Sequence, residues 1–345
     1  MATSLGTAMP FRRSLAPDGV IAGIDIGGTK IAALLVAADG EILGRGQVAA
    51  PALDGGAAMA DAAAELTRRL LEESGRPLLA AGVGAAGVID HVTGTVRAAS
   101  ATFVGWAGFA LADELRARLG VPVAVENDVN AFLLGEVSHG ETTGDDVLGV
   151  MLGTGVGGAV VLDGRLRHGP HGAAGEIGHT PGYSTLVCTC GQTGHLETLA
   201  SGTSIGLRYG EMTGVAGLSS PEVADRARAG DASAIAVFEA AGRAVALACA
   251  SAAGLLDVSM AVVGGGVARA WDLLAPAMER TLATDSPISG VTLRITPATL
   301  HTDAVALGAA AAAKAILLSG AAPSPHDPQS PHHSSSPHHE EGVVA

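Results

Sequence analysis

Four side chains between residues 179 and 195 have the types and the spacing of a metal site. They are His179, Cys188, Cys190 and His195, joined by a glycine-containing loop. Two imidazoles and two thiolates form a closed, four-coordinate structural zinc site, whereas a catalytic zinc keeps one position open for water. The cysteines are spaced Cys-x-Cys rather than Cys-x-x-Cys, which argues against a redox pair. The sequence therefore predicts a structural zinc ion in this loop.

Two short stretches rich in glycine could bind phosphate groups. The first is Asp25-Ile26-Gly27-Gly28-Thr29-Lys30, and the second is Gly153-Thr154-Gly155-Val156-Gly157-Gly158. Glycine lets the backbone approach an anion closely and adopt positive φ, so that consecutive N–H groups point at a phosphate. Asp25 could hold Mg²⁺ through water, because hard cations prefer oxygen ligands. The alternative is a pair of plain hairpin turns.

Both stretches lie between expected strands, and a third glycine run, Gly264-Gly265-Gly266, follows a later strand. Neither of the first two matches the nucleotide fingerprints in which glycines precede a helix. Two strand–turn–strand phosphate loops facing each other across a central cleft resemble the actin-like (ribonuclease H-like, hexokinase-type) ATPase arrangement. In such a fold the third run would lie beside the adenosine, and its alternative is a tight strand–helix turn.

A run of polar side chains, Glu126-Asn127-Asp128-Val129-Asn130, follows an expected strand and opens a helix. Phosphate transfer to a hydroxyl needs a carboxylate that accepts the hydroxyl proton and orients the oxygen. Asp128 lies at the carboxyl end of the strand, which is the usual ligand edge of an α/β sheet. Helix capping is the alternative, since Asn and Asp are preferred N-caps. Capping explains one such residue but not the whole run, so we interpret Asp128 as a catalytic base.

The elements that position these residues form a unit that occurs twice. Strands are expected at 20–26, 30–36 and 42–48, with Asp39-Gly40 in a hairpin turn, and this pattern is typical of an antiparallel meander. A second meander begins near residue 147, and helices and strands follow each meander. This pattern predicts a duplicated α/β fold. Further helices are expected at 57–74, 111–119 and 233–256, and further strands at 79–84, 122–125 and 258–263.

Composition excludes several classes of protein. The net charge of −14 argues against nucleic-acid binding, which needs clustered Lys and Arg. Three cysteines cannot complete a disulfide framework, which favours a reducing compartment, and Cys249 is expected in the core. The apolar stretches 244–256 and 304–318 are too short or too rich in alanine for a membrane span, and there is no signal peptide pattern. We expect a cytoplasmic protein with no membrane or nucleic-acid partner.

Taken together, the motifs resemble those of the ROK family (repressors, ORFs and sugar kinases). The matching segments are Asp-Ile-Gly-Gly-Thr-Lys, Glu-Asn-Asp-Val-Asn, Gly-Thr-Gly-Val-Gly-Gly, Glu-Ile-Gly-His and Cys-Thr-Cys-Gly-Gln-Thr-Gly-His-Leu-Glu, and they run in the family's order. The resemblance implies an actin-like two-domain fold and ATP·Mg²⁺-dependent phosphorylation of a hexose, normally at its 6-hydroxyl. The family's loop usually has a third cysteine where this chain has His195, which is still a good zinc ligand.

The resemblance also implies a role for individual residues. Asp128 would be the catalytic base, and His179 would bind zinc through one ring nitrogen and face the sugar with the other. The implied sugar contacts are Gly87, Asn127, Asp128, Glu176, His179 and Glu197. The implied ATP contacts are Asp25, Gly27, Gly28, Thr29, Lys30, Gly153, Thr154, Gly155, Gly157 and Gly265.

We expect two folded domains between two disordered ends, and a C-terminal helix that packs on the first domain. Disordered segments are expected at 1–19 and 320–345, an N-terminal domain at 20–124 and a C-terminal domain at 125–302. A helix near 303–319 would return to the N-terminal domain. A repressor is not favoured, because no helix-turn-helix pattern precedes the first glycine turn; a sugar sensor without catalysis is a further alternative.

The sugar is the least determined part of the expected function. The segment Leu196–Gly202 resembles N-acetylmannosamine and N-acetylglucosamine kinases more than glucokinases, which often carry an aromatic segment there. Glucokinase proper is the alternative. Many relatives form dimers, so a homodimer is an open expectation.

Overall fold

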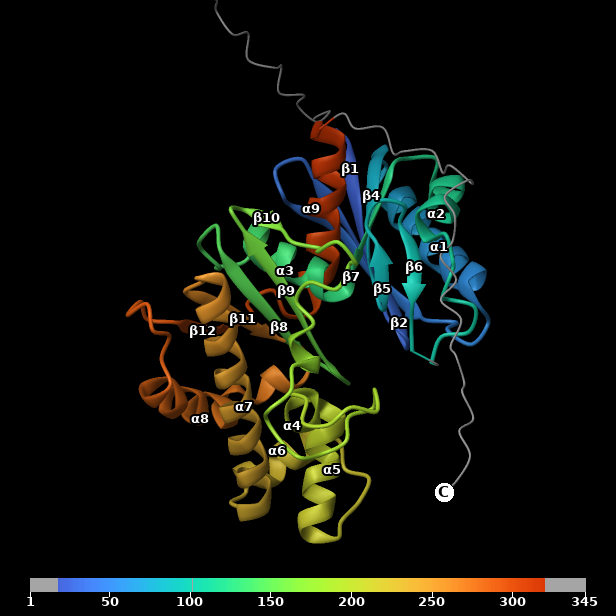
Figure 1. The fold of residues 1–345 in the computed structure, drawn as a ribbon. Helices are drawn as coiled ribbons and strands as arrows, with labels where there is room; N and C mark the ends of the chain where they lie inside the picture. The colour runs from blue at the N-terminus through green and yellow to red at the C-terminus, as the bar shows by residue number, and fades with distance from the viewer. Residues whose placement is uncertain (1–17, 101, 320–345) are drawn as a thin grey trace, which may run out of the picture.

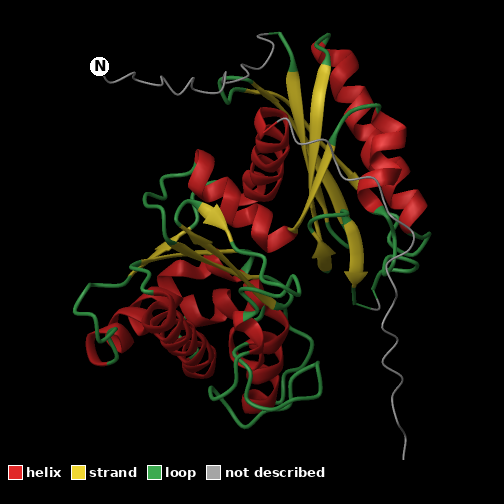
Figure 2. Cartoon of the chain, turned by 45° about the horizontal axis from the view of Figure 1, so that its top comes forward, coloured by secondary structure: helices red, strands yellow, loops and turns green. Residues whose placement is uncertain are grey.

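The computed structural model describes residues 18–100 and 102–319, and it contains two five-stranded sheets flanked by helices (Figure 1). Figure 2 shows the two sheets as separate α/β layers, with helices on their outer faces and between them. The expected segments 1–19 and 320–345 lie largely or wholly outside the described residues. The proposed division at residues 124 and 125 falls inside one strand, β7.

The first sheet has the strand order β3-β2-β1-β4-β7. Its first three strands form the predicted antiparallel meander, with Gly40 at positive φ in the turn, and β4 and β7 then add in parallel. Helices α1 and α2 cover one face, and they end at Gly75 and Gly120, each in the left-handed conformation. The bounds are β1 Val20–Ile26, β2 Lys30–Ala37, β3 Ile42–Ala49, α1 Gly56–Ser74, β4 Leu78–Ala85, α2 Leu111–Leu119 and β7 Val123–Asn127.

The second sheet has the order β10-β9-β8-β11-β12 and repeats the pattern of the first. Strands β8 and β9 are antiparallel around the second glycine turn, and β11 and β12 add in parallel. A large core of side chains from this sheet and its helices lies beneath it. The bounds are β8 Val147–Leu152, β9 Val156–Leu162, β10 Arg165–Leu166, α4 Glu197–Ala200, α5 Gly202–Thr213, α6 Ser220–Arg228, α7 Ala232–Leu256, β11 Met260–Gly264, α8 Trp271–Thr284 and β12 Arg294–Pro297.

Helices α3 (Asp128–His139) and α9 (Ala304–Ser319) pack closely against each other next to the first sheet. Their backbones meet at glycines: a Cβ at Gly308 would lie 1.7 Å from the carbonyl oxygen of Ala131, and one at Gly135 would lie 2.1 Å from that of Ala304. Glycine is required at such a contact because no side chain fits between the helices. This packing fixes α3, and therefore the position of Asp128 at its first residue.

Helix α9 also lies directly on the first sheet. A Cβ at Gly23 in β1 would be 1.9 Å from the carbonyl oxygen of Ala306, and one at Gly82 in β4 would be 1.7 Å from that of Ala309. The last helix of the described residues therefore packs on the first sheet, as the proposed return of this helix to the N-terminal domain requires.

Some elements were not predicted, and two apolar helices have the length and composition for a membrane span, contrary to the expectation from the sequence. The short hairpin of β5 (Val88–Asp90) and β6 (Thr95–Ala98) and the edge strand β12 had no clear signal. By length and composition α7 and α9 could span a membrane. However, α7 contributes to the core under the second sheet and α9 to the core on the first, which are the positions of core helices in a folded protein.

Candidate active site and metal cluster

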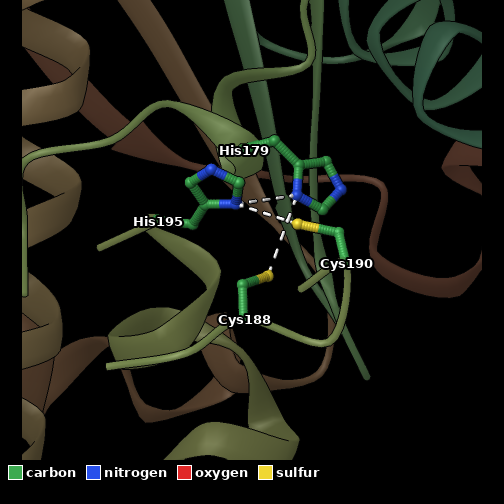
Figure 3. A group of neighbouring side chains, drawn as sticks. All are labelled: His179, Cys188, Cys190 and His195. Atoms are coloured by element: carbon green, nitrogen blue, oxygen red, sulfur yellow. Dashed lines mark hydrogen bonds between the residues drawn. The ribbon is translucent and has the colours of Figure 1, made fainter. Parts of the chain in front are cut away.

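The four predicted metal ligands come together in the structure. Figure 3 shows their ring nitrogens and sulfurs converging on one point. Nδ1 of His195 lies 3.3 Å from Nδ1 of His179 and 3.3 Å from Sγ of Cys190, and Sγ of Cys188 lies 3.9 Å from Nδ1 of His179. All four candidate ligand atoms lie within 4.8 Å of one another.

The two 3.3 Å distances suit a tetrahedral ion, and the longer ones, up to 4.8 Å, would shorten as the side chains close on it. Zinc bonds of about 2.0–2.1 Å to nitrogen and about 2.3 Å to sulfur place tetrahedral ligand atoms roughly 3.3–3.8 Å apart. In addition, Nε2 of His195 lies 3.1 Å from Oε1 of Gln192. A hydrogen bond from Nε2–H to this amide oxygen would leave Nδ1 of His195 unprotonated and able to bind a metal. The donor set therefore fits Zn²⁺.

Glu197 connects the metal loop to the second glycine turn. Its Oε2 accepts a hydrogen bond from the backbone N–H of Val156 over 2.9 Å, and its Oε1 accepts one from the hydroxyl of Thr189 over 3.0 Å. Gly155 leaves the space for this carboxylate, because a Cβ there would lie 2.5 Å from Oε2. Both carboxylate oxygens thus have partners within the protein, a link that sequence reasoning missed because Glu197 and Val156 are distant in the chain.

Asp128 is the first residue of α3, and Asn127 caps this helix. Oδ1 of Asn127 accepts from the backbone N–H groups of Val129 and Asn130. Nδ2 of the same side chain donates to Oδ1 of Asp128 and to the carbonyl of Gly87, over 2.9 Å in each case. The sequence allowed two interpretations of this run, helix capping and a catalytic site. The Asn127 amide is consistent with both, because it caps the helix and also holds the candidate base.

The two carboxylates expected to act at the reaction centre have raised pKa values. Burial raises the pKa of Asp128 to about 6, and Glu176 adds to this shift by repulsion. Burial and then repulsion by Asp128 raise the pKa of Asp25 to about 7, whereas Lys30 acts to lower it. Asp25 lies in β1 and Asp128 begins α3, so the fold brings the first glycine turn to the candidate base. Titratable groups with shifted pKa values in one place favour a functional site.

Backbone N–H groups are available in both glycine turns. In the first turn Gly27 donates to the carbonyl of Lys30, while the N–H groups of Gly28 and Thr29 have no acceptor among the described residues. In the second turn Gly153 donates to the carbonyl of Gly155, and Thr154 and Gly155 have no acceptor among those residues. Such groups can bind an anion.

The sequence suggested two reasons for glycine in these turns, close approach to an anion and positive φ. The structure does not bear out positive φ at three of these glycines. Gly28, Gly153 and Gly155 are not among the described glycines at positive φ. A close contact requires glycine at Gly155, where a Cβ would lie 2.5 Å from Oε2 of Glu197, whereas a Cβ at Gly28 or Gly153 would lie no nearer than 3.4 Å to another group. Gly157 lies in β9, where a Cβ would be 2.6 Å from Cγ2 of Val129. It makes room for α3.

The remaining predicted glycines lie beside these groups. Gly265 has φ of +89°, and a Cβ there would lie 2.4 Å from the carbonyl oxygen of Leu152, directly before the second turn. Gly87 has φ of +111° and presents its carbonyl to Asn127. Glu176 precedes the short 3₁₀ helix that ends at His179, so the candidate sugar contact and metal ligand are joined by one turn.

Aromatic side chains next to the first turn were missed. Trp106 is fully buried, and its indole N–H donates to the carbonyl of Ala86 over 3.0 Å. The ring of Phe103 stacks against Trp106 and lies against Gly28. The scarcity of aromatic residues, at 3% of the chain, could have drawn attention to this group.

The duplicated sheets, the two glycine turns and the carboxylate at the start of α3 define the actin-like class of α/β proteins, as predicted. The chain belongs to the ROK family, whose family model matches residues 21–316. The resemblance that the motifs indicated is therefore confirmed.

Relatives and solved structures agree with this assignment. The chain is 36% identical to a glucokinase of Halalkalibacterium halodurans over 83% of this chain and 92% of that protein. It is 34% identical to an N-acetylmannosamine kinase of Yersinia pseudotuberculosis over 85% of this chain and 98% of that one. The crystal structure of a ROK family glucokinase from Streptomyces griseus, in complex with glucose and AMPPNP, is similar with a TM-score of 0.73 and 32% identity, covering 86% of this chain and all of that one.

Proposed function

We propose that the protein is an ATP-dependent sugar kinase that transfers the γ-phosphate of ATP to the 6-hydroxyl of a hexose or N-acetylhexosamine. The single observation that carries this proposal is the environment of Asp128. It begins α3, it is held by Asn127, and its pKa of about 6 suits a base that works near neutral pH. The named sugar kinases among the relatives support the same conclusion.

In this mechanism Asp128 accepts a proton from the sugar. Its Oδ1 already accepts hydrogen bonds from Asn127 and from the backbone of Val129, which leaves Oδ2 for the 6-hydroxyl. As the hydroxyl oxygen forms its bond to the γ-phosphorus, its proton passes to Asp128 and the bond from that phosphorus to the bridging oxygen of ADP breaks.

The glycine turns hold the phosphates. The free N–H groups of Gly28 and Thr29 on one side, and of Thr154 and Gly155 on the other, donate to phosphate oxygens. Asp25 is suited to hold Mg²⁺ through water, and the ion would neutralise charge on the transferred phosphate. Lys30 adds positive charge near Asp25. Gly27 belongs to the first turn, Gly157 follows the second turn at the start of β9, and Gly265 would lie on the adenosine side.

We expect the sugar to bind between two pairs of residues. One pair is Asn127 and the backbone of Gly87, joined by a hydrogen bond, and the other is Glu176 and His179, joined by one turn. Because Nδ1 of His179 points into the cluster, its Nε2 remains for a sugar hydroxyl. Glu197 is the other sugar contact that the motifs imply. Through its hydrogen bond with Val156 it also holds the second glycine turn in place. Zinc would supply no chemistry to the transfer and would hold this part of the site in place.

The identity of the sugar is decided by comparing substrates. The chain is about as similar to the N-acetylmannosamine kinase (34%) as to the glucokinase (36%), so identity does not separate them. The experiment is the ratio of kcat/KM for glucose, mannose, N-acetylglucosamine and N-acetylmannosamine with ATP and Mg²⁺. A preference for one of these sugars supports the proposal, and the product phosphate should be on oxygen 6. If none is phosphorylated while sugars still bind, the protein is a sugar sensor.

Two coarser proposals accompany this function. We place the enzyme in the cytoplasm, because its three cysteines are free in the structure and its substrates would be intracellular. A homodimer is proposed on the family resemblance alone and is tested by the mass of the protein in solution.

A further inference from the structure

A cavity of about 620 Å³ lies beyond the edge of the first sheet, lined by none of the residues proposed for catalysis. It exists because the sheet ends at β7: α2 packs on one face of this strand and α9 on the other, and no further strand fills the space between the helices. Val125, Leu134 and Ile316 give it apolar walls. Its volume is within the range of about 300–1,000 Å³ that is usual for small-molecule sites.

The polar side chains of this cavity are mostly basic, although the chain has a net charge of −14. Arg116, Arg165, His91 and His168 line it. The acidic residue, Glu126, has its two oxygens 2.9 and 3.1 Å from Nε2 of His168, so its carboxylate can accept a hydrogen bond from this ring. The rings of His91 and His168 are stacked with centroids 3.9 Å apart. Burial and then the neighbouring His168 lower the pKa of His91, so the permanent positive charge comes from Arg116 and Arg165, whose guanidinium groups can bind an anionic ligand.

One buried hydrogen-bond donor in this group lacks a partner, and two exposed side chains beside it form no ion pair or hydrogen bond within the described residues. Nε of Arg116 is buried and has no acceptor, although Nη1 of the same residue pairs with Asp113. The side chain of Arg165 is exposed and forms no ion pair or hydrogen bond within the described residues. His91 is also exposed, and its ring forms no hydrogen bond with those residues. A buried donor without an acceptor is destabilising, so an acceptor bound beside Nε of Arg116 would be favoured.

We propose that this cavity binds a small organic anion, with a phosphate or carboxylate group between Arg116, Arg165 and His91 and an apolar body against Val125 and Ile316. A simple inorganic ion would leave the apolar walls unfilled. A neutral apolar molecule would leave the donors unpaired.

Ligand bound there would act on the catalytic carboxylate. The cavity is lined by the whole stretch from Val123 to Glu126, and the next residues of the chain are Asn127 and Asp128. Leu134 and Ser138 of α3 also line it, as does Arg165 of β10 in the second sheet. A ligand that contacts both sheets stabilises whichever arrangement of the two sheets it binds more tightly. A difference in affinity between two arrangements is what a regulatory site requires.

The test uses phenyl phosphate as the probe and the full-length, zinc-loaded protein, with AMPPNP and Mg²⁺ at saturation to occupy the ATP site. Calorimetry should show one probe molecule bound per chain. Arg165→Gln, an exposed substitution, should weaken binding at least tenfold, and Ala315→Trp, which fills the cavity, should abolish it. Arg69→Gln makes the same charge change at an exposed side chain of α1, away from the cavity, and should leave binding unchanged. Inorganic phosphate and benzyl alcohol should bind at least tenfold more weakly.

Three results would overturn the proposal: no binding of phenyl phosphate at millimolar concentration, unchanged binding to Ala315→Trp, or equal weakening by Arg69→Gln. Thermal unfolding of each variant shows that it is folded. Coupling is tested by hydrogen exchange, which should slow at 123–138 when the probe binds to the wild type and not to Ala315→Trp. Binding without this protection would refute the regulatory part. None of these readouts requires kinase activity, so they are independent of the proposed function.

Discussion

Nδ2 of Asn127 donates to Oδ1 of Asp128 over 2.9 Å, while Oδ1 of Asn127 caps the helix that Asp128 begins. The amide thus performs two tasks with two different atoms. Substitutions can separate these tasks, because aspartate keeps the capping oxygens but has no N–H to donate.

Asn127→Asp should keep the stability of α3 and alter the base. The new carboxylate loses the donor to Asp128 and adds a negative charge beside it, and both changes raise the pKa of Asp128. In the wild type kcat should fall as the pH drops through about 6, because protonated Asp128 cannot accept a proton. In the variant this acid limb should move to higher pH. The measurement is the pH dependence of kcat.

Asn127→Ala is the companion to this variant. It removes the cap as well, so the free energy of unfolding should fall by about 1 kcal/mol in urea denaturation. If Asn127→Asp is destabilised as much as Asn127→Ala, or if its acid limb does not move, the separate role of Nδ2 is wrong.

Asp25→Asn should stabilise the protein in the absence of nucleotide and Mg²⁺. The pKa of Asp25 is raised to about 7 in the folded state, so the folded state binds a proton more tightly than the unfolded state. This group therefore lowers stability as the pH rises from about 4 through 7. The variant should unfold at a higher temperature at pH 8, with little gain at pH 4, and should lose most activity.

Asp54→Asn is the matched control, since Asp54 is exposed. It should leave both the unfolding temperature and the activity unchanged. A lower unfolding temperature for Asp25→Asn at pH 8 would contradict the interpretation of Asp25 as a functional carboxylate held at a cost in stability.

His195→Ala should lower zinc content and thermal stability together. His195 is buried, and its Nδ1 lies 3.3 Å from candidate ligand atoms of two other residues, so its loss leaves three ligands. Metal analysis of the purified protein and thermal unfolding are the two measurements. His171→Ala, on an exposed histidine outside the cluster, is the control and should keep one zinc ion per chain. Unchanged zinc stoichiometry in His195→Ala would exclude it as a ligand.

Trp106→Phe should weaken sugar binding more than it slows the transfer step. Phenylalanine keeps the stacked ring but cannot donate to the carbonyl of Ala86, whose neighbour Gly87 holds Asn127. We expect KM for the sugar to rise about 3- to 10-fold, as a loss of roughly 1 kcal/mol implies, with a smaller change in kcat. Trp271→Phe is the control for the loss of a tryptophan. Equal effects of the two substitutions would show that the hydrogen bond of Trp106 has no part in sugar binding.

Much of this site could be predicted from sequence because its chemistry is local. The four metal ligands lie within one loop, and the Asp-Gly turn and the glycine turns are short-range signals that determine the hairpins around them. The pattern of Asn127 and Asp128 after a strand also needs no knowledge of distant segments.

What could not be predicted depends on contacts between distant segments. The link from Glu197 to Val156, the bond from Trp106 to Ala86 and the packing of Gly135 on α9 are fixed only when the whole chain folds. Short elements such as β5 and β6 are too brief for periodicity to reveal them. The same applies to the cavity beside β7, which results from where the sheet ends.

The most direct test of the central claim is the turnover of Asp128→Asn with the best sugar of the panel, ATP and Mg²⁺. Asparagine keeps the size of the side chain and an oxygen for the hydrogen bonds, but it cannot take the hydroxyl proton. We predict that kcat falls by about 10²–10⁴-fold, while calorimetry shows that the sugar still binds within a fewfold of its wild-type affinity. A kcat within threefold of the wild type would contradict the assignment of Asp128 as the base.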